Sequence, residues 1–353
     1  MAKVLMKGNE AIGAAAIAAG CKYFFGYPIT PQSELPEYMA RELPKIGGVF
    51  LQAESEVAAI NMVYGAAGAG VRVMTSSSSP GISLKQEGIS YIAGAELPCV
   101  IVNIMRGGPG LGSIQPSQTD YFQSTRGGGN GDYRMVVYAP ADVQELVDLM
   151  MEGFDVADQY RNPVMVAGDG MIGQMMEPIE FKTPKGRKLP EKTWATDGTK
   201  GNRKPNIINS LYIDPQSLED HNIKLQAKYK EMEENEVRVD SYNIEDADVV
   251  IAAYGTTSRI AKTAIAKMEK EGMKVGLIRP ITLWPYPYDE FKKINPDCKG
   301  VLTVEMNSGQ MIDDVKIAVE GKFPVSFYGR MGGMIPEPEA IIEEVKKIYG
   351  GEM

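Results

Sequence analysis

Several short segments carry residues whose chemistry suits a ligand-binding site. The turn at residues 26–31, GYPITP, holds two prolines that stiffen its backbone and one threonine hydroxyl. Glu54 and Glu56 follow a β-rich run, where a carboxylate either bonds a cofactor ring nitrogen or simply favours the first turn of a helix. Arg106 precedes Gly-Gly-Pro-Gly, a setting that suits capture of a carboxylate or a structural ion pair.

Other segments argue against common alternatives. Gly168-Asp169-Gly170 resembles the start of a magnesium–diphosphate site, but a segment rich in lysine and proline follows it, so we reject a metal site there. The chain has no P-loop and no G-x-G-x-x-G between a strand and a helix. Its three cysteines, Cys21, Cys99 and Cys298, lie far apart, which argues against disulfides and against a zinc or iron–sulfur site built by this chain alone.

Charge and composition narrow the function further. The single histidine, His221, lies in a polar stretch and is expected to be solvated, so a carboxylate or a bound cofactor must carry any proton chemistry. The net charge of −9 argues against binding to nucleic acid or to anionic membranes. We find no apolar run of roughly 18–20 residues and no signal-peptide pattern in residues 1–10, so we expect a cytoplasmic protein.

The elements that must position these residues alternate in type. Strand-like runs at 22–26, 49–52, 72–75, 99–105, 135–138 and 164–167 are separated mostly by helical patterns. This alternation predicts an α/β fold with a doubly wound parallel sheet. We expect Thr30 to cap a helix that Pro31 begins, and Ser55 to cap a helix over 56–69.

The rest of the chain predicts a loop, a connection and a second domain. Residues 106–134 hold eight glycines and leave the C-terminal end of a strand, where ligands bind in open α/β sheets, so we expect a functional loop. A polar connection with a helix near 215–235 follows. Strands at 249–254, 275–279, 301–305 and 325–328 then predict a smaller α/β domain. The expected limits are 1–180, 181–244 and 245–353.

Together these segments resemble the alpha-type subunits of the 2-oxo acid:ferredoxin oxidoreductases. The shared motifs are GYPITP at 26–31, AESEVAA at 53–59, TSSSSPG at 75–81 and NIMRGGP at 103–109. Four motifs in the family's order make the resemblance specific, and it extends over essentially the whole chain. Within the family the chain is most similar to the enzymes of 3-methyl-2-oxobutanoate, also called 2-ketoisovalerate.

The resemblance implies a fold and a site. The fold is a thiamine diphosphate-binding domain of the pyrimidine type, followed by a domain like the C-terminal domain of transketolase. The cofactor would be shared with a partner subunit, with Glu56, rather than Glu54, bonded to its aminopyrimidine ring. Tyr27 and Pro28 would lie on the cofactor side, whereas Thr30 and Arg106 would contact the substrate's carboxylate or carbonyl. No metal ligand is expected in this chain.

The resemblance also implies a reaction and partners. The reaction is oxidative decarboxylation of a branched-chain 2-oxo acid with coenzyme A to acyl-CoA and CO2, with electrons passed to ferredoxin. A diphosphate-binding beta-type subunit would carry Mg²⁺, and a ferredoxin-like subunit would carry the iron–sulfur clusters. A gamma-type subunit and an external ferredoxin complete the expected partners. Neither nucleic acid nor a membrane is expected among them.

Three alternatives stay open. A 2-oxoglutarate enzyme of the same family would need a second cation for the second carboxylate, and Arg126 and Arg134 are available in the glycine-rich loop. A non-catalytic assembly subunit would use Glu56 and Arg106 only structurally. A stand-alone nucleotide-binding α/β protein is the weakest alternative, because the chain lacks a phosphate loop.

Overall fold

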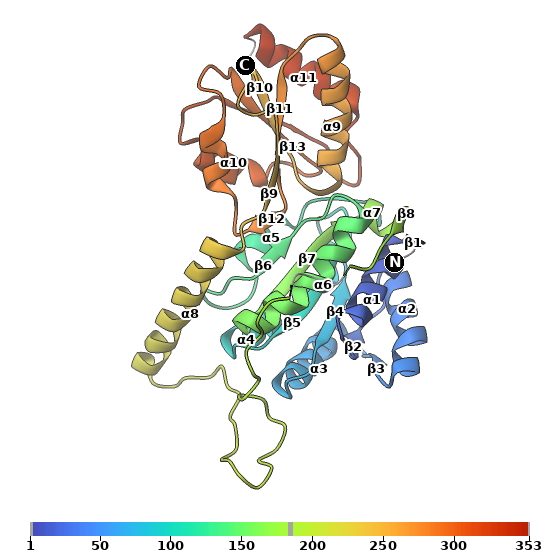
Figure 1. The fold of residues 1–353 in the computed structure, drawn as a ribbon, viewed down its shortest axis with the longest axis vertical. Helices are drawn as coiled ribbons and strands as arrows, with labels where there is room; N and C mark the ends of the chain where they lie inside the picture. The colour runs from blue at the N-terminus through green and yellow to red at the C-terminus, as the bar shows by residue number, and fades with distance from the viewer. Residues whose placement is uncertain (1–2, 183–185, 352–353) are drawn as a thin grey trace.

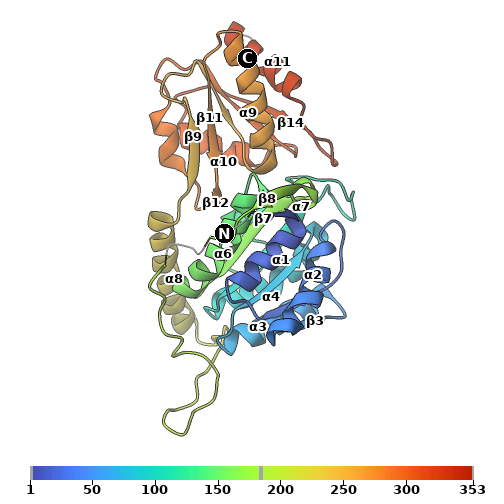
Figure 2. The same ribbon diagram turned by 45° about the vertical axis from the view of Figure 1, so that its right-hand side comes forward.

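Two α/β bodies, one above the other, make up the molecule in the computed structural model (Figure 1). The structure describes residues 3–182 and 186–351. The helix α8 (Pro215–Asn235) runs along the side of the lower body, and an extended segment that precedes it projects below that body (Figures 1 and 2). The helix predicted near 215–235 is therefore confirmed.

The lower body is built on a seven-stranded sheet in the order β12-β6-β7-β5-β4-β2-β3. All neighbours pair in parallel except β12 with β6. The strands are β2 (Tyr23–Gly26), β3 (Val49–Gln52), β4 (Val73–Ser77), β5 (Cys99–Met105), β6 (Val136–Tyr138), β7 (Pro163–Asp169) and β12 (Thr282–Trp284). The predicted parallel sheet is thus confirmed, with small shifts at the strand ends.

Helices cover both faces of this sheet (Figures 1 and 2). On one face α1 (Gly8–Ala18) packs against α2 (Glu34–Glu42) and α6 (Val143–Tyr160). On the other face α3 (Glu56–Gly68) packs against α4 (Ser79–Gly94). β4 and β5 are buried along their whole length, as expected for parallel strands covered on both faces.

The turn after β2 differs from the prediction. The peptide bond between Thr30 and Pro31 is cis, and α2 begins only at Glu34. The first backbone bond of the i→i−4 type runs from the Glu37 amide to the Ser33 carbonyl. The prediction that Thr30 caps this helix and that Pro31 begins it was therefore wrong, because residues 30–33 form a separate turn. Thr30 is left exposed.

The upper body has a five-stranded sheet in the order β14-β13-β10-β11-β9. Only β9 is antiparallel to its neighbour. The helices α9 (Gly255–Lys270) and α11 (Pro338–Gly350) pack together, as do α10 (Met311–Val319) and the 3-10 helix at Tyr288–Lys293. The strands are β9 (Val239–Tyr242), β10 (Val249–Ala252), β11 (Val275–Pro280), β13 (Gly300–Glu305) and β14 (Val325–Gly329).

Three strand pairings were missed by the sequence analysis, and one of them is that of β9, which lies in the segment expected to be a connection and pairs antiparallel with β11 in the second sheet. After β11 the chain returns to the lower body as β12, which pairs with β6 and forms an edge of the first sheet. Near the start of the chain, β1 (Val4–Lys7) pairs antiparallel with β8 (Met176–Ile179). We keep the limits 1–180, 181–244 and 245–353 as our proposal for the domains, with β12 as a strand that crosses between them.

The glycine-rich loop 106–134 joins the two bodies. It contains the helix α5 (Tyr121–Arg126), and Gln118 in this loop is buried between the bodies. The Gln118 amide group donates to the Tyr254 carbonyl (2.9 Å) and accepts from the Thr257 hydroxyl (2.8 Å) and the Met306 amide (3.0 Å). Gln118 therefore bonds to the loops that follow β10 and β13.

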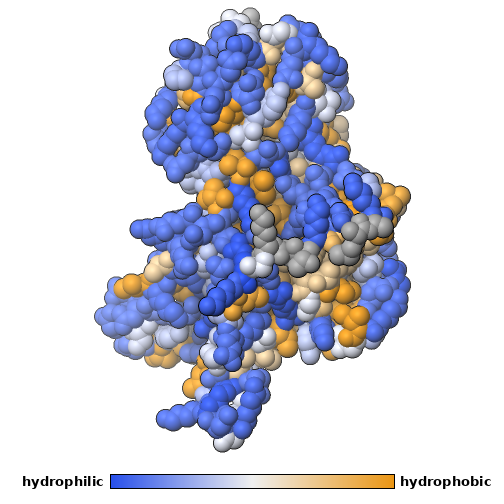
Figure 3. Space-filling view, in the orientation of Figure 1, coloured by the Kyte–Doolittle hydropathy of each residue, from blue (hydrophilic) through white to orange (hydrophobic). Residues whose placement is uncertain are grey.

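The visible surface is mainly hydrophilic, and hydrophobic residues gather at the waist between the two bodies (Figure 3). Within residues 3–182 and 186–351, no helix has both the length and the apolar character that a membrane crossing requires.

Replacing Gln118 by leucine tests the junction between the bodies. The variant leaves a buried carbonyl, a hydroxyl and an amide without their partner, so we expect the free energy of unfolding to fall by roughly 2–4 kcal/mol. The control is Gln226→Leu on α8, because this glutamine is exposed and its side chain donates to the Asp132 carbonyl (2.9 Å) and to no other group among the described residues. The control should change stability by less than about 0.5 kcal/mol. If chemical denaturation shows the same fall in the free energy of unfolding for both variants, the assigned role of Gln118 is contradicted.

Candidate active site

The carboxyl ends of neighbouring parallel strands gather the predicted site residues along one edge of the first sheet. Residues 27–30 follow β2, Glu56 follows β3, and Arg106 directly follows β5. Tyr27, Pro28 and Thr30 are exposed in this chain, so they remain available to a ligand or to another subunit. This edge is where open α/β sheets bind ligands.

Glu56 occupies the first turn of α3 and is only 7% exposed, whereas Glu54 is exposed. The Ser55 hydroxyl accepts from the Ala58 amide (3.1 Å), which confirms Ser55 as the helix cap. Within the described residues, no hydrogen bond or ion pair within 4.0 Å engages the Glu56 carboxylate. Gly81 lies close to it, because a Cβ on Gly81 would be 2.8 Å from Glu56 Oε1 and 2.0 Å from the Ser77 hydroxyl oxygen.

Arg106 is buried and binds backbone carbonyls. Its guanidinium donates to the Thr30 carbonyl (2.9 Å) and to the Leu111 carbonyl (3.0 Å), while Nε is buried without a hydrogen-bond partner in the described part of the chain. Arg106 therefore joins the turn after β2 to the glycine-rich loop. One edge of its guanidinium is left for a further acceptor.

A buried polar cluster holds this loop to the start of α4. The Asp120 carboxylate accepts from the Ser79 hydroxyl (2.6 Å) and from the Asn103 amide group (2.8 Å). The Ser79 hydroxyl in turn accepts from the Arg106 amide (3.0 Å). Burial raises the pKa of Asp120, although the bonds from Ser79 and Asn103 oppose this shift. The cluster fixes the backbone from which the Arg106 side chain departs.

Sequence reasoning missed Lys85, which lies on α4 and is completely buried. Its ammonium group donates to the Thr75 hydroxyl (2.7 Å) and to the Ser76 carbonyl (2.9 Å) at the end of β4. Burial lowers the pKa of Lys85 to about 7, and the nearby Glu56 carboxylate opposes that shift. The signal was present in the sequence, because Lys85 falls on the apolar stripe of Ile82 and Ile89.

Polar atoms without partners also collect at this edge. The hydroxyls of Ser77 and Ser78 and the amide nitrogen of Gln32 are buried and have no hydrogen-bond partner within residues 3–182 and 186–351. Buried polar groups are normally bonded, so such groups at one sheet edge suit a polar ligand. Neighbouring Ser76 is satisfied, since its hydroxyl donates to the Gln32 amide oxygen at 2.6 Å.

Two cavities flank the loop that Arg106 begins. One has a volume of about 300 Å³, and its lining includes Thr30, Pro31 and Gln115. The other has a volume of about 1020 Å³ and lies between the bodies, with Asp120 and Met331 among its lining residues. The glycine-rich loop predicted to be functional thus separates two hollows at the sheet edge.

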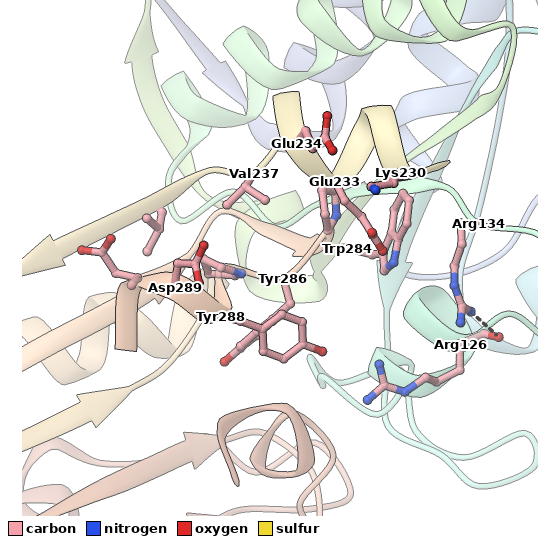
Figure 4. A pocket seen from close by; sticks show the side chains of 14 residues that line it. Arg126, Arg134, Lys230, Glu233, Glu234, Val237, Trp284, Tyr286, Tyr288 and Asp289 are labelled. Atoms are coloured by element: carbon pink, nitrogen blue, oxygen red, sulfur yellow. Dashed lines mark hydrogen bonds between the residues drawn. The ribbon is translucent and has the colours of Figure 1, made fainter. Parts of the chain in front are cut away.

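A third cavity, of about 670 Å³, lies away from the predicted residues (Figure 4). Its walls include Arg126, Arg134 and the aromatic side chains of Trp284 and Tyr286. Arg126 is already paired with the buried Asp314 carboxylate at 2.8 Å. None of the predicted site residues lines this cavity, so we do not assign it to the site.

The remaining sequence candidates have structural roles. Asp169 caps the short helix α7 (Gly170–Gln174), since its carboxylate accepts from the Met171 and Ile172 amides. The three cysteines are buried and free, and burial raises the pKa of Cys99 to about 12. The prediction for His221 was wrong, because its ring is half-buried, stacks on Tyr212 (4.8 Å between ring centroids) and lies 2.7 Å from the Gly94 carbonyl oxygen.

Two known protein families match most of the sequence of this chain. Residues 14–244 match the family described as pyruvate flavodoxin/ferredoxin oxidoreductase, thiamine diphosphate-binding, and residues 247–341 match the pyruvate:ferredoxin oxidoreductase core domain II. The chain belongs to the alpha-type subunits of the 2-oxo acid:ferredoxin oxidoreductases. It is 50% identical over 350 residues to ketoisovalerate oxidoreductase subunit VorB from Methanothermobacter thermautotrophicus, and the match covers 99% of each chain.

Solved structures agree with the family and the fold. The 2-oxoglutarate:ferredoxin oxidoreductase from Magnetococcus marinus is 30% identical, with a TM-score of 0.86 over 98% of this chain and 65% of that chain. A split-gene transketolase has a TM-score of 0.61 over 99% of both chains at 14% identity, so it supports the fold alone. The α/β fold expected from the sequence, with its transketolase-like second domain, is confirmed.

Gly81→Ala tests whether close packing fixes Glu56. The added methyl group would overlap the Ser77 hydroxyl and press on Glu56, so we expect turnover by the assembled oxidoreductase to fall about 10- to 100-fold. Gly65→Ala is the control, because it lies within α3 with no heavy atom within 4 Å of its added Cβ. Steady-state assays should show normal turnover for the control. Normal turnover of Gly81→Ala would contradict the packing argument.

Proposed function

We propose that this chain is the subunit of a branched-chain 2-oxo acid:ferredoxin oxidoreductase that binds the pyrimidine side of thiamine diphosphate. The observation that supports this most directly is the buried Glu56 carboxylate, which lies at the carboxyl edge of the sheet without a bonded partner in the described chain. The substrate would be 3-methyl-2-oxobutanoate, as the name of the VorB relative suggests. We also propose a cytoplasmic location, which rests on the sequence expectation alone.

The residues present fit a polar aromatic ring. A carboxylate can bond a ring nitrogen, and the unpartnered groups of Ser77, Ser78 and Gln32 supply further donors and acceptors at the same edge. Pro28 and Tyr27 offer exposed apolar surface beside them. Once bound, thiamine diphosphate would supply the chemistry that removes CO2 from the 2-oxo acid.

In this proposal the chain's own residues place and polarise the reactants. Glu56 holds the aminopyrimidine ring by a hydrogen bond and sets its proton distribution, so no protein histidine is needed for that proton transfer. Thr30 and Arg106 bind the carboxylate or carbonyl of the 2-oxo acid. Two observations support this role: Nε of Arg106 has no hydrogen-bond partner in the described part of the chain, and Thr30 is exposed.

The site is half of a shared one in this proposal. Tyr27, Pro28 and Thr30 are exposed, which supports a second subunit that covers them and binds the diphosphate with Mg²⁺. We propose a beta-type subunit for that role, together with a gamma-type subunit, an iron–sulfur subunit, coenzyme A and an external ferredoxin. These partners follow from the family to which the chain belongs and from relatives named as subunits.

Glu56→Gln separates a catalytic from a purely structural role. The amide keeps the size of the side chain but cannot carry the negative charge, so we expect turnover by the assembled complex to fall about 100-fold or more. Glu54→Gln is the matched control, since this neighbour is exposed and should leave turnover unchanged. Size-exclusion chromatography should show intact assembly for both variants. Near-normal turnover of Glu56→Gln would favour the non-catalytic assembly subunit.

A comparison of two substrates tests the proposed 2-oxo acid. A 2-oxoglutarate enzyme needs a second cation, yet Arg126 is paired with Asp314, and Arg134 lines a cavity that excludes Thr30 and Arg106. We therefore expect kcat/KM for 3-methyl-2-oxobutanoate to exceed that for 2-oxoglutarate by about 100-fold, because the second carboxylate would be buried unpaired. Preference of the purified complex for 2-oxoglutarate would reverse the assignment.

A further inference from the structure

The side chain of Asp120 is buried at a point where three segments of the chain meet. It lies in the glycine-rich loop directly before α5, and its relative exposure is 9%. Although Asp120 occupies the cap position of α5, its side chain bonds no amide of that fully described helix. An aspartate is almost never buried this deeply unless it has partners. Its role must therefore lie in the bonds that it makes outside α5.

Those bonds form a closed ring with Ser79 and Asn103. Oδ2 of Asp120 accepts from the Ser79 hydroxyl (2.6 Å) and from the Asn103 side-chain amide (2.8 Å). The Asn103 amide oxygen accepts in turn from the backbone amide of Ser79 (3.1 Å). Asn103 belongs to β5, and Ser79 is the first residue of α4. The ring thus joins the loop to the end of a central strand and to the start of a helix.

The Ser79 hydroxyl extends this ring to the backbone of Arg106. Its oxygen accepts from the Arg106 amide (3.0 Å). Its one hydrogen can reach either Asp120 or the Arg106 carbonyl (3.2 Å), but only the bond to Asp120 has the usual length for two oxygens. The Arg106 carbonyl accepts instead from the Thr119 hydroxyl (3.3 Å). Asp120 therefore orients the hydroxyl that holds Arg106.

The guanidinium of Arg106 depends on this backbone position. It donates to the carbonyls of Thr30 (2.9 Å) and Leu111 (3.0 Å), which belong to two different segments. A displacement of the Arg106 backbone by about 1 Å would lengthen at least one of these bonds beyond the usual range. Displacements of that size are enough to impair a binding or catalytic group.

We propose that Asp120 is a positioning residue for Arg106, and that through Ser79 it holds the guanidinium where it can bind the carboxylate or carbonyl of the 2-oxo acid. This inference rests on the proposed function, in which Arg106 contacts the substrate. Asp120 itself touches neither cofactor nor substrate in this role. It acts as a hydrogen-bond acceptor, so an uncharged acceptor of the same shape can replace it.

The test is the steady-state kinetics of the assembled complex with Asp120→Leu, measured with 3-methyl-2-oxobutanoate. Leucine accepts no hydrogen bond, and the adjacent cavity of about 1020 Å³ has room for its larger side chain. We expect KM for the 2-oxo acid to rise about tenfold and kcat to change by less than about threefold, because the lost contact is made both before and during the reaction.

Asp120→Asn is the conservative variant that should rescue binding. Its amide oxygen can accept from both Ser79 and Asn103, so KM should lie within about threefold of the unmodified complex. A KM as high as that of Asp120→Leu would overturn the inference, because the acceptor oxygen would then not be what matters.

A double-mutant cycle shows whether Asp120 acts through Arg106. Once Arg106→Met has removed the guanidinium, loss of the Asp120 acceptor should have nothing further to displace. The double variant should therefore have the same KM as Arg106→Met alone. Independent effects, in which the two increases in KM multiply, would overturn the inference.

Asp158→Leu is the matched control for lost stability. Asp158 is a buried carboxylate on α6 that accepts from Arg72 (2.8 Å) and pairs with Lys192 (2.6 Å), away from the predicted site residues. Its loss should destabilise the chain and leave KM for the 2-oxo acid unchanged. An equal increase in KM for Asp158→Leu and Asp120→Leu would show a general effect and would overturn the inference.

The outcomes separate this inference from the proposed function. A raised KM in Arg106→Met with an unchanged KM in Asp120→Leu would overturn the role of Asp120 and leave the proposed function standing. An unchanged KM in Arg106→Met would remove Arg106 from the proposed function itself. If Asp120→Leu does not assemble, Ser79→Ala gives the same readout, because it removes the hydroxyl that accepts from the Arg106 amide. A raised KM in Ser79→Ala supports the inference, and an unchanged one overturns it.

Discussion

The hydrogen bonds of the glycine-rich loop 106–134 connect the turn after β2, the start of α4 and the second sheet. Arg106, at the start of this loop, donates a hydrogen bond from its guanidinium to the carbonyl of Thr30 in the turn after β2. Asp120 anchors the loop to Ser79 at the start of α4, and Gln118 bonds the loops that follow β10 and β13 in the second sheet. The contacts of Asp120 and Gln118 are buried, so breaking one of them leaves polar groups without water. The loop therefore sets the relative position of two sheets and of one edge of the site.

This constraint explains why the site residues come from distant parts of the sequence. Strand order brings the ends of β2, β3, β4 and β5 to one edge, but strands alone do not orient side chains. Glu56 is oriented by close packing against Gly81, and Arg106 by its two carbonyl acceptors. The rigid parts belong to this chain, whereas the exposed residues 27–30 are left for what binds there. Glu56 and Arg106 are thus held in place by this chain, whereas residues 27–30 are exposed.

Periodicity predicted the regular elements well, because buried parallel strands are continuous apolar runs that are easy to find. β3 and β5 have the predicted bounds, and α8 coincides with the predicted helix. The turn at Thr30 was mispredicted, because a capping residue before proline looks the same in sequence whether the helix starts at once or three residues later. β12 is too short to show a period, and its partner strand is over a hundred residues away.

The sequence predicted which residues belong to the candidate site, but it did not predict the contacts that these residues make. Glu56, Arg106 and the turn at 26–31 were selected by type and position, and the structure brings them to one edge. The bonds of Arg106 to backbone carbonyls could not be foreseen, because they depend on how the loop folds. Lys85 escaped notice because a lysine in an amphipathic helix is usually taken for a surface residue. Its position on the apolar stripe was the only sign in the sequence.

The return of the chain as β12 has a consequence for how the protein can be divided. β12 covers the flank of β6, so the first sheet ends on a strand supplied by residues that follow β11 in the second body. A fragment that stopped before residue 245 would leave β6 as an open edge, and open edges invite pairing with other chains. Natural or engineered division of this subunit between its two bodies therefore needs the second piece to supply a strand in trans. The two bodies look separate in the ribbon diagram, but the chain that follows β11 supplies β12 to the seven-stranded sheet of the lower body.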